Sequence, residues 1–169
     1  MNTFCYAFTL LLVVAFAGPA LADKSFDICI NPATDVVLDD LAPPGFSAGD
    51  GFVGVAIIVP GGTIPTDGFG VASCSTIASA RIGTFFAKGR IVIGLPNAAL
   101  DDLAYVDWQF RIDGRGSIDT SGPVKIVPAL GTYPQTIVGA TGNGLGSGKG
   151  AATVKALTAD GFQFRLIIP

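Results

Sequence analysis

The fold of this chain is decided by residues 105–116, which read Tyr105-Val106-Asp107-Trp108-Gln109-Phe110-Arg111-Ile112-Asp113-Gly114-Arg115-Gly116. Polar and apolar side chains alternate up to Ile112, so one face of an extended chain carries Asp107 and Arg111 and the other carries Trp108 and Phe110. This two-residue period predicts a β-strand that is buried on one side. The Asp113-Gly114 pair then predicts a hairpin turn, from which the next strand returns antiparallel.

The same signals continue in both directions from this hairpin. Short apolar runs end at glycine or proline, and no amphipathic helix of ten residues appears. Asp160-Gly161 predicts a second hairpin near the C-terminus. The other predicted strands lie near residues 36–38, 52–59, 69–77 (carrying Cys74), 81–95, 124–127, 136–140, 150–157 and 162–168.

About eight strands without crossover helices predict an all-β domain and argue against an α/β fold. A closed antiparallel barrel and a sandwich both fit this pattern. Gly83 and Gly89 lie inside the longest apolar run, where they fit the bends that a barrel wall needs. We therefore expect an antiparallel closed barrel of about eight strands.

The first 22 residues have the form of a cleavable signal peptide. The apolar run from Phe4 to Phe16 is shorter than the roughly 20 residues that span a bilayer, and Ala20-Leu21-Ala22 is a typical cleavage site. An uncleaved membrane anchor is the alternative, and the Gly18-Pro19 pair argues against it. We expect residues 1–22 to be removed and residues 23–169 to form one extracellular domain, without a membrane span in the mature chain.

Composition narrows the range of partners. The formal net charge is −3, without the basic excess that a phosphate-binding surface shows, so we expect no nucleic acid as a partner. Only 14% of the residues are charged and 50% are hydrophobic. A surface poor in charge favours association, and we expect a homo-oligomer.

Cys29 and Cys74 are the two cysteines that remain after signal-peptide cleavage. An oxidising compartment favours a disulfide between them, which closes a loop of about 45 residues and contributes about 3 to 4 kcal/mol in the chain-entropy model. Two free buried thiols are the alternative.

Several kinds of chemistry are excluded or disfavoured. Histidine is absent, which rules out Ser-His-Asp and Cys-His catalysis and disfavours an ordinary zinc or copper site. The glycine-rich stretch 139–150 is not a phosphate loop, because Asn143 stands where glycine is required and Gly150 where serine or threonine is required. We expect tight turns there and no metal or nucleotide cofactor.

The candidate polar groups for a catalytic or binding site lie on two predicted strands. Asp107 shares one face of its strand with Tyr105 and Arg111, and Lys88 and Arg90 lie on the long central strand. This face points either into the barrel or to water. The outward orientation is favoured, because Trp108 and Phe110 are better core residues.

The chain also resembles the allene oxide cyclase and dirigent superfamily of small barrels. The resemblance rests on short glycine-based motifs in the same order, and it covers roughly residues 47–168. In place of the family's Gly-Gly-Thr-Gly this chain has Gly139-Ala140-Thr141-Gly142, and no catalytic residue of the family aligns with a residue here. The motifs are Ser47–Val53, Gly70–Cys74 (read as a small-residue strand), Ile82–Ile91, Thr136–Gly142 and Phe162–Leu166.

The resemblance implies an eight-stranded barrel with a central apolar cavity, assembled as a dimer or trimer. Relatives cyclise a fatty-acid epoxide or steer the coupling of phenolic radicals, so the expected function is binding, cyclisation or coupling of a small apolar molecule. Any enzymatic activity would be isomerase-like or dirigent-type. The alternative is a non-catalytic extracellular protein that acts through its surface. This alternative would be favoured if all charged side chains lay outside the barrel and if no cavity exceeded about 300 Å³.

Overall fold

The computed structural model describes residues 24–40, 48–65, 71–93, 103–125, 131–142, 145, 148–158 and 162–169. The expected signal peptide, residues 1–22, and the turn at Asp160-Gly161 lie outside these residues. Within the described residues no helix is long and apolar enough to cross a membrane.

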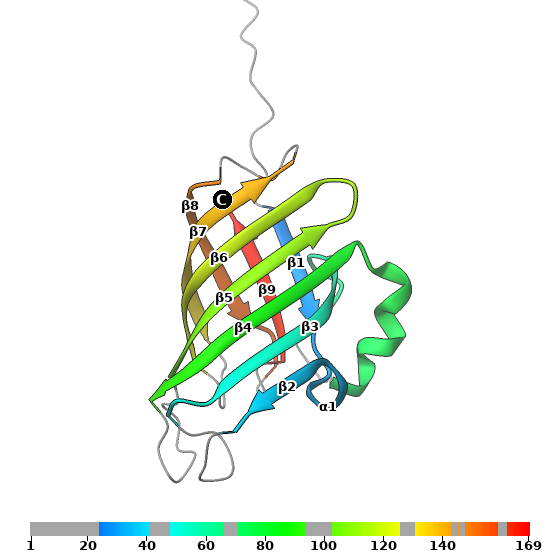
Figure 1. Cartoon of the computed structure of the whole chain (residues 1–169). Helices are drawn as coiled ribbons and strands as arrows, with labels where there is room; N and C mark the ends of the chain where they lie inside the picture. The colour runs from blue at the N-terminus through cyan, green and yellow to red at the C-terminus, as the bar shows by residue number, and fades with distance from the viewer. Residues whose placement is uncertain are drawn as a thin grey trace, which may run out of the picture.

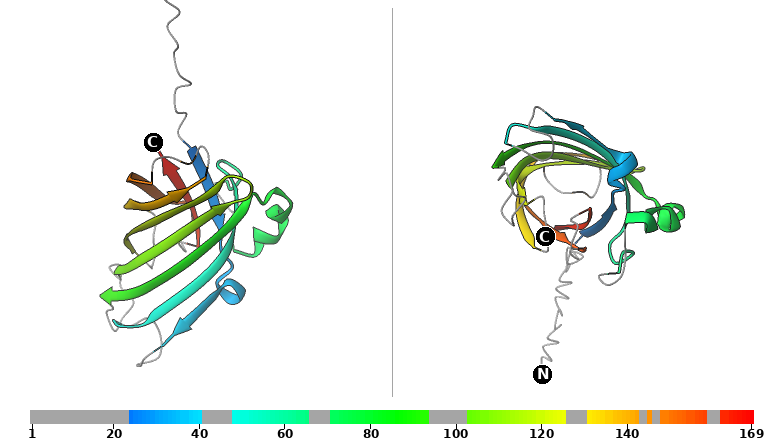
Figure 2. Two further views of the ribbon diagram at one scale, coloured as in Figure 1. Left: turned by 45° about the horizontal axis from the view of Figure 1, so that its top comes forward. Right: turned by 90° about the horizontal axis from the view of Figure 1, so that it is seen from below.

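The described residues form a closed eight-stranded antiparallel barrel with one extra strand (Figures 1 and 2). The eight barrel strands are β1 and β3 to β9, and β2 is the additional strand. Neighbours in the sequence are neighbours in the sheet from β3 to β9, and β1 closes the ring by pairing with both β9 and β3. The strands are β1 Lys24–Cys29, β2 Val36–Asp39, β3 Gly51–Pro60, β4 Gly83–Ile93, β5 Leu103–Ile112, β6 Gly116–Lys125, β7 Thr132–Thr141, β8 Gly150–Ala156 and β9 Gln163–Ile168.

Strand β3 is long enough to pair with two strands in succession. Its first half pairs with β2, where Val36 lies opposite Gly54, and its second half pairs with β1, where Ile28 lies opposite Ile58. Between β1 and β2 the chain makes one helical turn, α1 (Pro32–Asp35), whose Ala33 amide donates to the Asn31 side chain at 3.2 Å. Strand β2 therefore extends one end of the barrel wall.

The barrel interior is an aromatic and aliphatic core. Strand β5 shows the predicted alternation, because Val106, Trp108 and Phe110 are buried while Tyr105 and Asp107 are exposed. The rings of Trp108 and Phe164 stack with centroids 4.8 Å apart, and Phe85 meets both rings edge-on. The predicted hairpin is also present, with a turn at Asp113–Arg115 that joins β5 to β6.

The prediction of a strand over 69–77 is wrong, and so is the reading of Gly70–Cys74 as a strand. Residues Val71–Ala80 form a 3₁₀ helix, η1, on the outside of the barrel (Figure 1). Cys74, Ile77 and Ala80 pack against a small outer cluster, whereas the residues between them are exposed. Their spacing of three residues is the period of a 3₁₀ helix and not that of a strand.

Strand β1 was not among the predicted strands. It has a clear alternation, with Phe26 and Ile28 pointing inward and Asp27 and Cys29 outward. All four are nevertheless buried, because the loop after β3 and helix η1 cover the outer face of β1. The wrongly predicted strand and the missed strand cancel, so the number of predicted strands matches the nine of the sheet, eight of which form the barrel.

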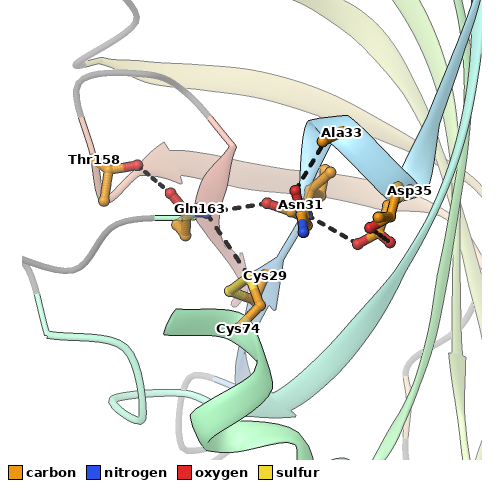
Figure 3. The surroundings of a disulfide bond; sticks show 9 residues. Cys29, Asn31, Ala33, Asp35, Cys74, Thr158 and Gln163 are labelled. Atoms are coloured by element: carbon orange, nitrogen blue, oxygen red, sulfur yellow. Dashed lines mark hydrogen bonds between the residues drawn. A yellow bond between two sulfur atoms is a disulfide. The ribbon is translucent and has the colours of Figure 1, made fainter. Parts of the chain in front are cut away.

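The predicted disulfide is confirmed: Cys29 on β1 is bonded to Cys74 on η1 (Figure 3). The buried Gln163 side chain lies beside it and donates from Nε2 to the Ile30 carbonyl at 3.1 Å. The hydroxyl of Thr158 in turn donates to Gln163 Oε1 at 2.6 Å. The disulfide and this amide together connect η1, β1 and the start of β9.

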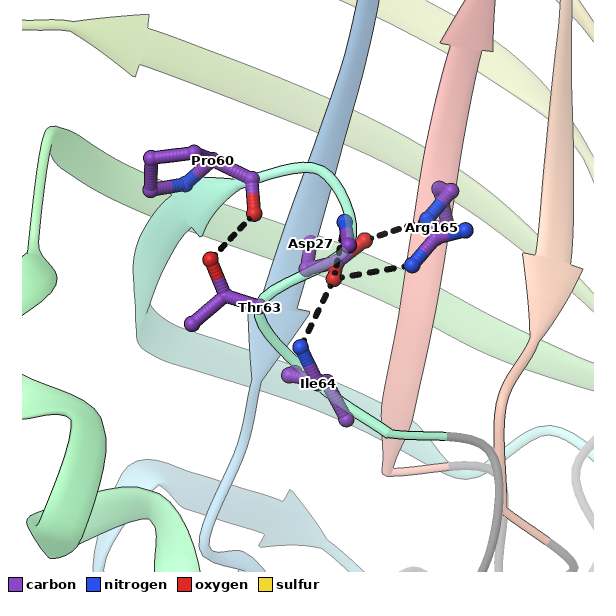
Figure 4. Close-up of polar contacts among 6 residues, drawn as sticks. Asp27, Pro60, Thr63, Ile64 and Arg165 are labelled. Carbon is purple, nitrogen blue, oxygen red and sulfur yellow. Dashed lines mark hydrogen bonds and ion pairs between the residues drawn. The ribbon is translucent and has the colours of Figure 1, made fainter.

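A buried ion pair lies near the middle of β1, two residues before Cys29 (Figure 4). Both carboxylate oxygens of Asp27 accept from the Arg165 guanidinium, at 2.5 and 3.0 Å. Asp27 Oδ2 also accepts from the backbone amides of Gly62 and Ile64, each at 2.9 Å. This carboxylate therefore ties the loop after β3 to β1 and β9.

The glycine-rich stretch 139–150 has turn geometry at its described glycines. Gly142 has φ of 88° and Gly148 has φ of 70°, in the left-handed region that favours glycine. Strand β8 begins directly at Gly150, so a strand rather than a helix N-terminus follows this stretch. This agrees with the prediction of tight turns.

Candidate functional site

An apolar cavity of about 120 Å³ occupies the end of the barrel that β2 extends. Beyond it the interior is filled by the core side chains of the other end, such as Phe26, Ile112 and Ile168. The cavity is lined by Ile30, Val36, Leu38, Phe52, Gly54, Phe85, Ala87, Val106, Trp108, Val124, Lys125, Tyr133, Val154, Ala156, Phe162 and Phe164.

Large rings and small residues together shape this cavity. Phe85, Trp108 and Phe164 belong both to its lining and to the packed aromatic cluster below it. Gly54 and Ala87 face each other on β3 and β4, and a Cβ atom added at Gly54 would lie 3.7 Å from Cβ of Ala87. Two neighbouring wall positions with almost no side chain therefore contribute to the space of the cavity.

Two polar residues of the lining lie at adjacent ends of neighbouring strands. Lys125 ends β6 and Tyr133 lies at the start of β7. Burial raises the pKa of the Tyr133 phenol, and the positive charge of Lys125 opposes that rise in pKa. The phenol therefore remains neutral, and able to donate a hydrogen bond, throughout the physiological pH range.

The five candidate residues from the sequence are all exposed on the outside of the barrel, which for Tyr105, Asp107 and Arg111 is the orientation that the sequence favoured. Lys88 lies opposite Asp107 and Arg90 opposite Tyr105 in the β4–β5 register, and all four line an outer pocket of about 380 Å³. Arg111 is not part of that pocket. Its guanidinium carbon lies 5.9 Å from the centre of the Phe86 ring.

The outer pocket differs in chemistry from the inner cavity. Two cations, Lys88 and Arg90, share it with two carboxylates, Asp39 and Asp107. Asp107 accepts a hydrogen bond of 2.6 Å from the Ser121 hydroxyl. The pocket's other lining residues are Val37, Gly51, Phe52, Val53, Gly89 and Tyr105.

Lys125 and Tyr133 were not among the candidates from the sequence. Lys125 lies inside the predicted strand 124–127, where an alternating pattern places it on the solvent side. Tyr133 precedes the predicted strand 136–140, whereas β7 begins at Thr132. Tyr133 and Gln135 are separated by two positions, as are Gln135 and Ile137, and this spacing is the signal of a longer strand.

The residues that the structure describes contain no group of three or more cysteine, aspartate or glutamate side chains arranged to hold a metal ion.

Comparison with known proteins identifies the fold. Neither the family models nor the curated proteins include a match to this sequence. The solved structure of a pyocyanin demethylase superposes with a TM-score of 0.58 at 18% identity, over 87% of this chain and 100% of that one. A nonspecific heme-binding cyclase that catalyses a 4 + 2 cycloaddition in neoabyssomicin biosynthesis has a TM-score of 0.47 at 18% identity, over 86% of this chain and 62% of that one.

The likeness to the demethylase shows that this chain has the fold of a small barrel protein. At 18% identity the likeness carries no residue role across. The reactions named for these two proteins are therefore theirs, and function must be argued from the cavity itself.

Proposed function

We propose that this protein is a secreted barrel of the allene oxide cyclase and dirigent type that binds a small apolar molecule in its inner cavity. The observation that carries the proposal is the cavity of about 120 Å³, which is lined mostly by aromatic and aliphatic residues at one end of the barrel, while core side chains fill the other end. The barrel fold shared with the demethylase agrees with this proposal.

The size and lining of the cavity define the ligand. An apolar cavity of about 150 Å³ stays dry and takes up benzene, because water gains too few hydrogen bonds there. The cavity here is about 120 Å³, so it accommodates one ring or a short branched chain rather than a drug-sized molecule. The aromatic lining favours a planar ring, which Trp108 and Phe164 can contact through their faces and edges.

The expected contribution to a reaction is control of the ligand's conformation. The described lining contains no carboxylate, and Lys125 is its one charged group. The described lining therefore offers no carboxylate for acid–base catalysis, and its expected contribution is to hold a ligand in a reactive conformation. This is the way in which a barrel steers a cyclisation or a coupling.

Filling the cavity tests the proposal. The Ala87→Leu variant places three extra carbon atoms next to Gly54, and we expect it to weaken binding of toluene at least tenfold because the ring loses its space. The free energy of unfolding should change by less than about 1.5 kcal/mol, since the added side chain enters existing space. Isothermal titration and denaturant unfolding measure the two quantities.

Ala151→Leu is the matched control, because Ala151 lies on β8 with its side chain exposed to solvent. This variant adds the same atoms outside the barrel and should bind toluene as the parent protein does. Unchanged binding of toluene by Ala87→Leu would show that the ligand does not occupy this cavity.

A second candidate function is supported by the outer surface. The inner cavity is below about 300 Å³, and the pocket of about 380 Å³ on the outer face of β2 to β5 is the larger one. Val37, Val53 and Tyr105 are exposed there by 67%, 51% and 53%. Exposed apolar side chains grouped on neighbouring strands are typical of an interaction surface.

The occupant that we infer for this face is a second copy of the chain. Lys88 and Arg90 on β4 lie between Asp39 on β2 and Asp107 on β5. In a two-fold contact each copy presents the same patch, so the cations of one copy can meet the carboxylates of the other around the exposed valines.

The Val53→Asp variant tests this contact. A carboxylate at the centre of the apolar patch must lose its hydration in the interface, so we expect the homo-oligomer to dissociate into monomers. Val138→Asp is the control, because Val138 is 61% exposed on β7, outside this patch, and should leave the oligomer intact. Native mass spectrometry measures the oligomeric state of the parent protein and of both variants. A parent protein that is monomeric at tens of micromolar would contradict the inference.

A further inference from the structure

We propose that Phe52 sets the size of the ligand that the inner cavity accepts, and that Gly89 provides the space in which the Phe52 ring lies. With the ring in this place, the cavity admits a molecule with one ring and excludes a molecule with two fused rings. The inference rests on the proposed function, because it names the residue that selects among the ligands of that cavity.

The side chain of Phe52 faces the barrel interior at the end that holds the cavity. Val53 and Val55 are exposed on β3, whereas Gly54 between them is buried. This alternation places Phe52 on the same side as Gly54, as the first inward-facing residue of the strand. Phe52 lines the cavity and packs against the main hydrophobic core.

Gly89 lies directly opposite Phe52 in the pairing of β3 with β4. A Cβ atom added at Gly89 would lie 2.6 Å from Cε1 of Phe52 and 2.9 Å from Cγ1 of Val106, whereas packed carbon atoms are about 3.5 to 4.0 Å apart. The φ angle of Gly89 lies outside the left-handed region, so the backbone there does not require glycine. Glycine at this position therefore provides space for the Phe52 ring against the barrel wall.

Three other large rings of the lining are held in place by one another. Phe85, Trp108 and Phe164 form ring contacts with centroids between 4.8 and 5.6 Å apart. Phe52 takes part in none of the ring contacts of this cluster. Its ring can therefore be removed to widen the cavity while all three members of the cluster remain.

The Phe52 ring also has a structural role that the test must separate from ligand selection. An aromatic ring placed over a glycine of the neighbouring strand stabilises the pairing of two strands. A loss of stability in a Phe52 variant would therefore fit either role. The preference between a small and a large ligand separates them, because strand pairing does not depend on ligand size.

Toluene and naphthalene are suitable probes, because both are uncharged and apolar and they differ in having one ring or two. We expect the parent protein to bind toluene at least tenfold more tightly than naphthalene. Apolar affinity normally rises with the area removed from water, so a preference for the smaller probe reports exclusion by size. Equilibrium dialysis measures both affinities.

Phe52→Ala removes the ring, and we expect this variant to bind naphthalene at least tenfold more tightly than the parent protein does. Toluene should bind more weakly, because it loses its contact with the ring, so the preference between the probes is reversed. Phe52→Leu removes fewer atoms and should shift the preference in the same direction by about threefold. It keeps the test available if the alanine variant does not fold.

Phe86→Ala is the matched control, because it removes the same ring from the other face of β4. Phe86 is outside the cavity lining, and its ring centre lies 5.9 Å from the guanidinium carbon of Arg111. This variant should keep the preference of the parent protein for toluene.

Gly89→Ala tests where the ring lies. The added methyl group takes the space of the Phe52 ring and pushes the ring off the wall toward the cavity, so we expect toluene to bind at least fivefold more weakly. In the Phe52→Ala background the same substitution should change toluene binding by less than twofold, because the methyl group enters vacated space. Such non-additivity is expected when two side chains compete for one space.

The outcomes distinguish the inference from the function beneath it. If toluene does not bind the parent protein, the cavity is not a binding site and both proposals fail. If naphthalene binds the parent protein as tightly as toluene, or if the preference for toluene survives in Phe52→Ala, Phe52 does not set the ligand size and the proposed function still stands. An equal loss of toluene binding on adding Gly89→Ala to the parent protein and to Phe52→Ala would overturn the role of Gly89.

Discussion

Reducing the Cys29–Cys74 disulfide should lower the free energy of unfolding by about 3 to 4 kcal/mol. The bond closes a loop with a sequence separation of 45 residues, and the chain-entropy model assigns that stabilisation to the smaller freedom of the cross-linked unfolded chain. The loss is a large part of the 5 to 15 kcal/mol by which domains are typically stable.

The structure also predicts which part of the protein responds first. Helix η1 meets the barrel through Cys74, Ile77 and Ala80, whereas the barrel strands are joined by continuous ladders of hydrogen bonds. After reduction, the amides of η1 should exchange with solvent faster than those of β4 and β5, because η1 has few other contacts that hold it.

Urea unfolding of the oxidised and the reduced parent protein measures the effect without removing a sulfur atom. The Cys29→Ala, Cys74→Ala double variant serves as a control that cannot reoxidise, and should be at least as unstable as the reduced protein. A difference below about 1 kcal/mol between the oxidised and reduced forms would contradict the prediction and show that η1 stabilises the barrel without the cross-link.

Asp27→Ala should destabilise the protein by about 3 kcal/mol. The Asp27 side chain is completely buried and holds the Arg165 guanidinium together with the amides of Gly62 and Ile64. Its removal leaves a partly buried cation and two amides without their acceptor, and loss of one partner of a buried pair costs about 3 to 5 kcal/mol. The side chain of Arg165 is 23% exposed, which places the expected cost at the lower end of that range.

Asp113→Ala is the matched control, because it removes an aspartate from an exposed ion pair instead of a buried one. Asp113 pairs with Arg81 at 3.8 Å, but both side chains are about half exposed, so its loss should change the free energy of unfolding by less than about 0.5 kcal/mol. A further Arg165→Met substitution should recover part of the stability of Asp27→Ala, because the uncompensated cation is gone. Equal stabilities of Asp27→Ala and Asp113→Ala in urea would contradict this account.

Much of the fold was predictable from local pattern. The alternation on β5, the turn at Asp113–Arg115 and the strand starting at Gly150 are all present. The helix η1 was mistaken for a strand because a short run of small and apolar residues fits either period, and only contact of Cys74, Ile77 and Ala80 with the barrel selects the spacing of three.

The candidate site was less predictable than the fold. Periodicity correctly favoured an outward face for Asp107 and Arg111, and the register then brought Lys88, Arg90, Tyr105 and Asp107 together around one outer pocket. The inner cavity had no local signal at all. It depends on small residues at Gly54 and Ala87, which are 33 positions apart and meet only because β3 pairs with β4.

The amino-acid sequence by itself determined the all-β class and favoured an antiparallel barrel and the pairing of Cys29 with Cys74, because alternation, turn residues and the number of cysteines are local or countable properties. Only the tertiary structure decided the covered outer face of β1, the position of η1, and the volume and lining residues of the cavity. These depend on how side chains from many strands share one interior. Protein interiors are packed as densely as organic crystals. A cavity therefore forms only where residues that are distant in the sequence and adjacent in the fold all have small side chains.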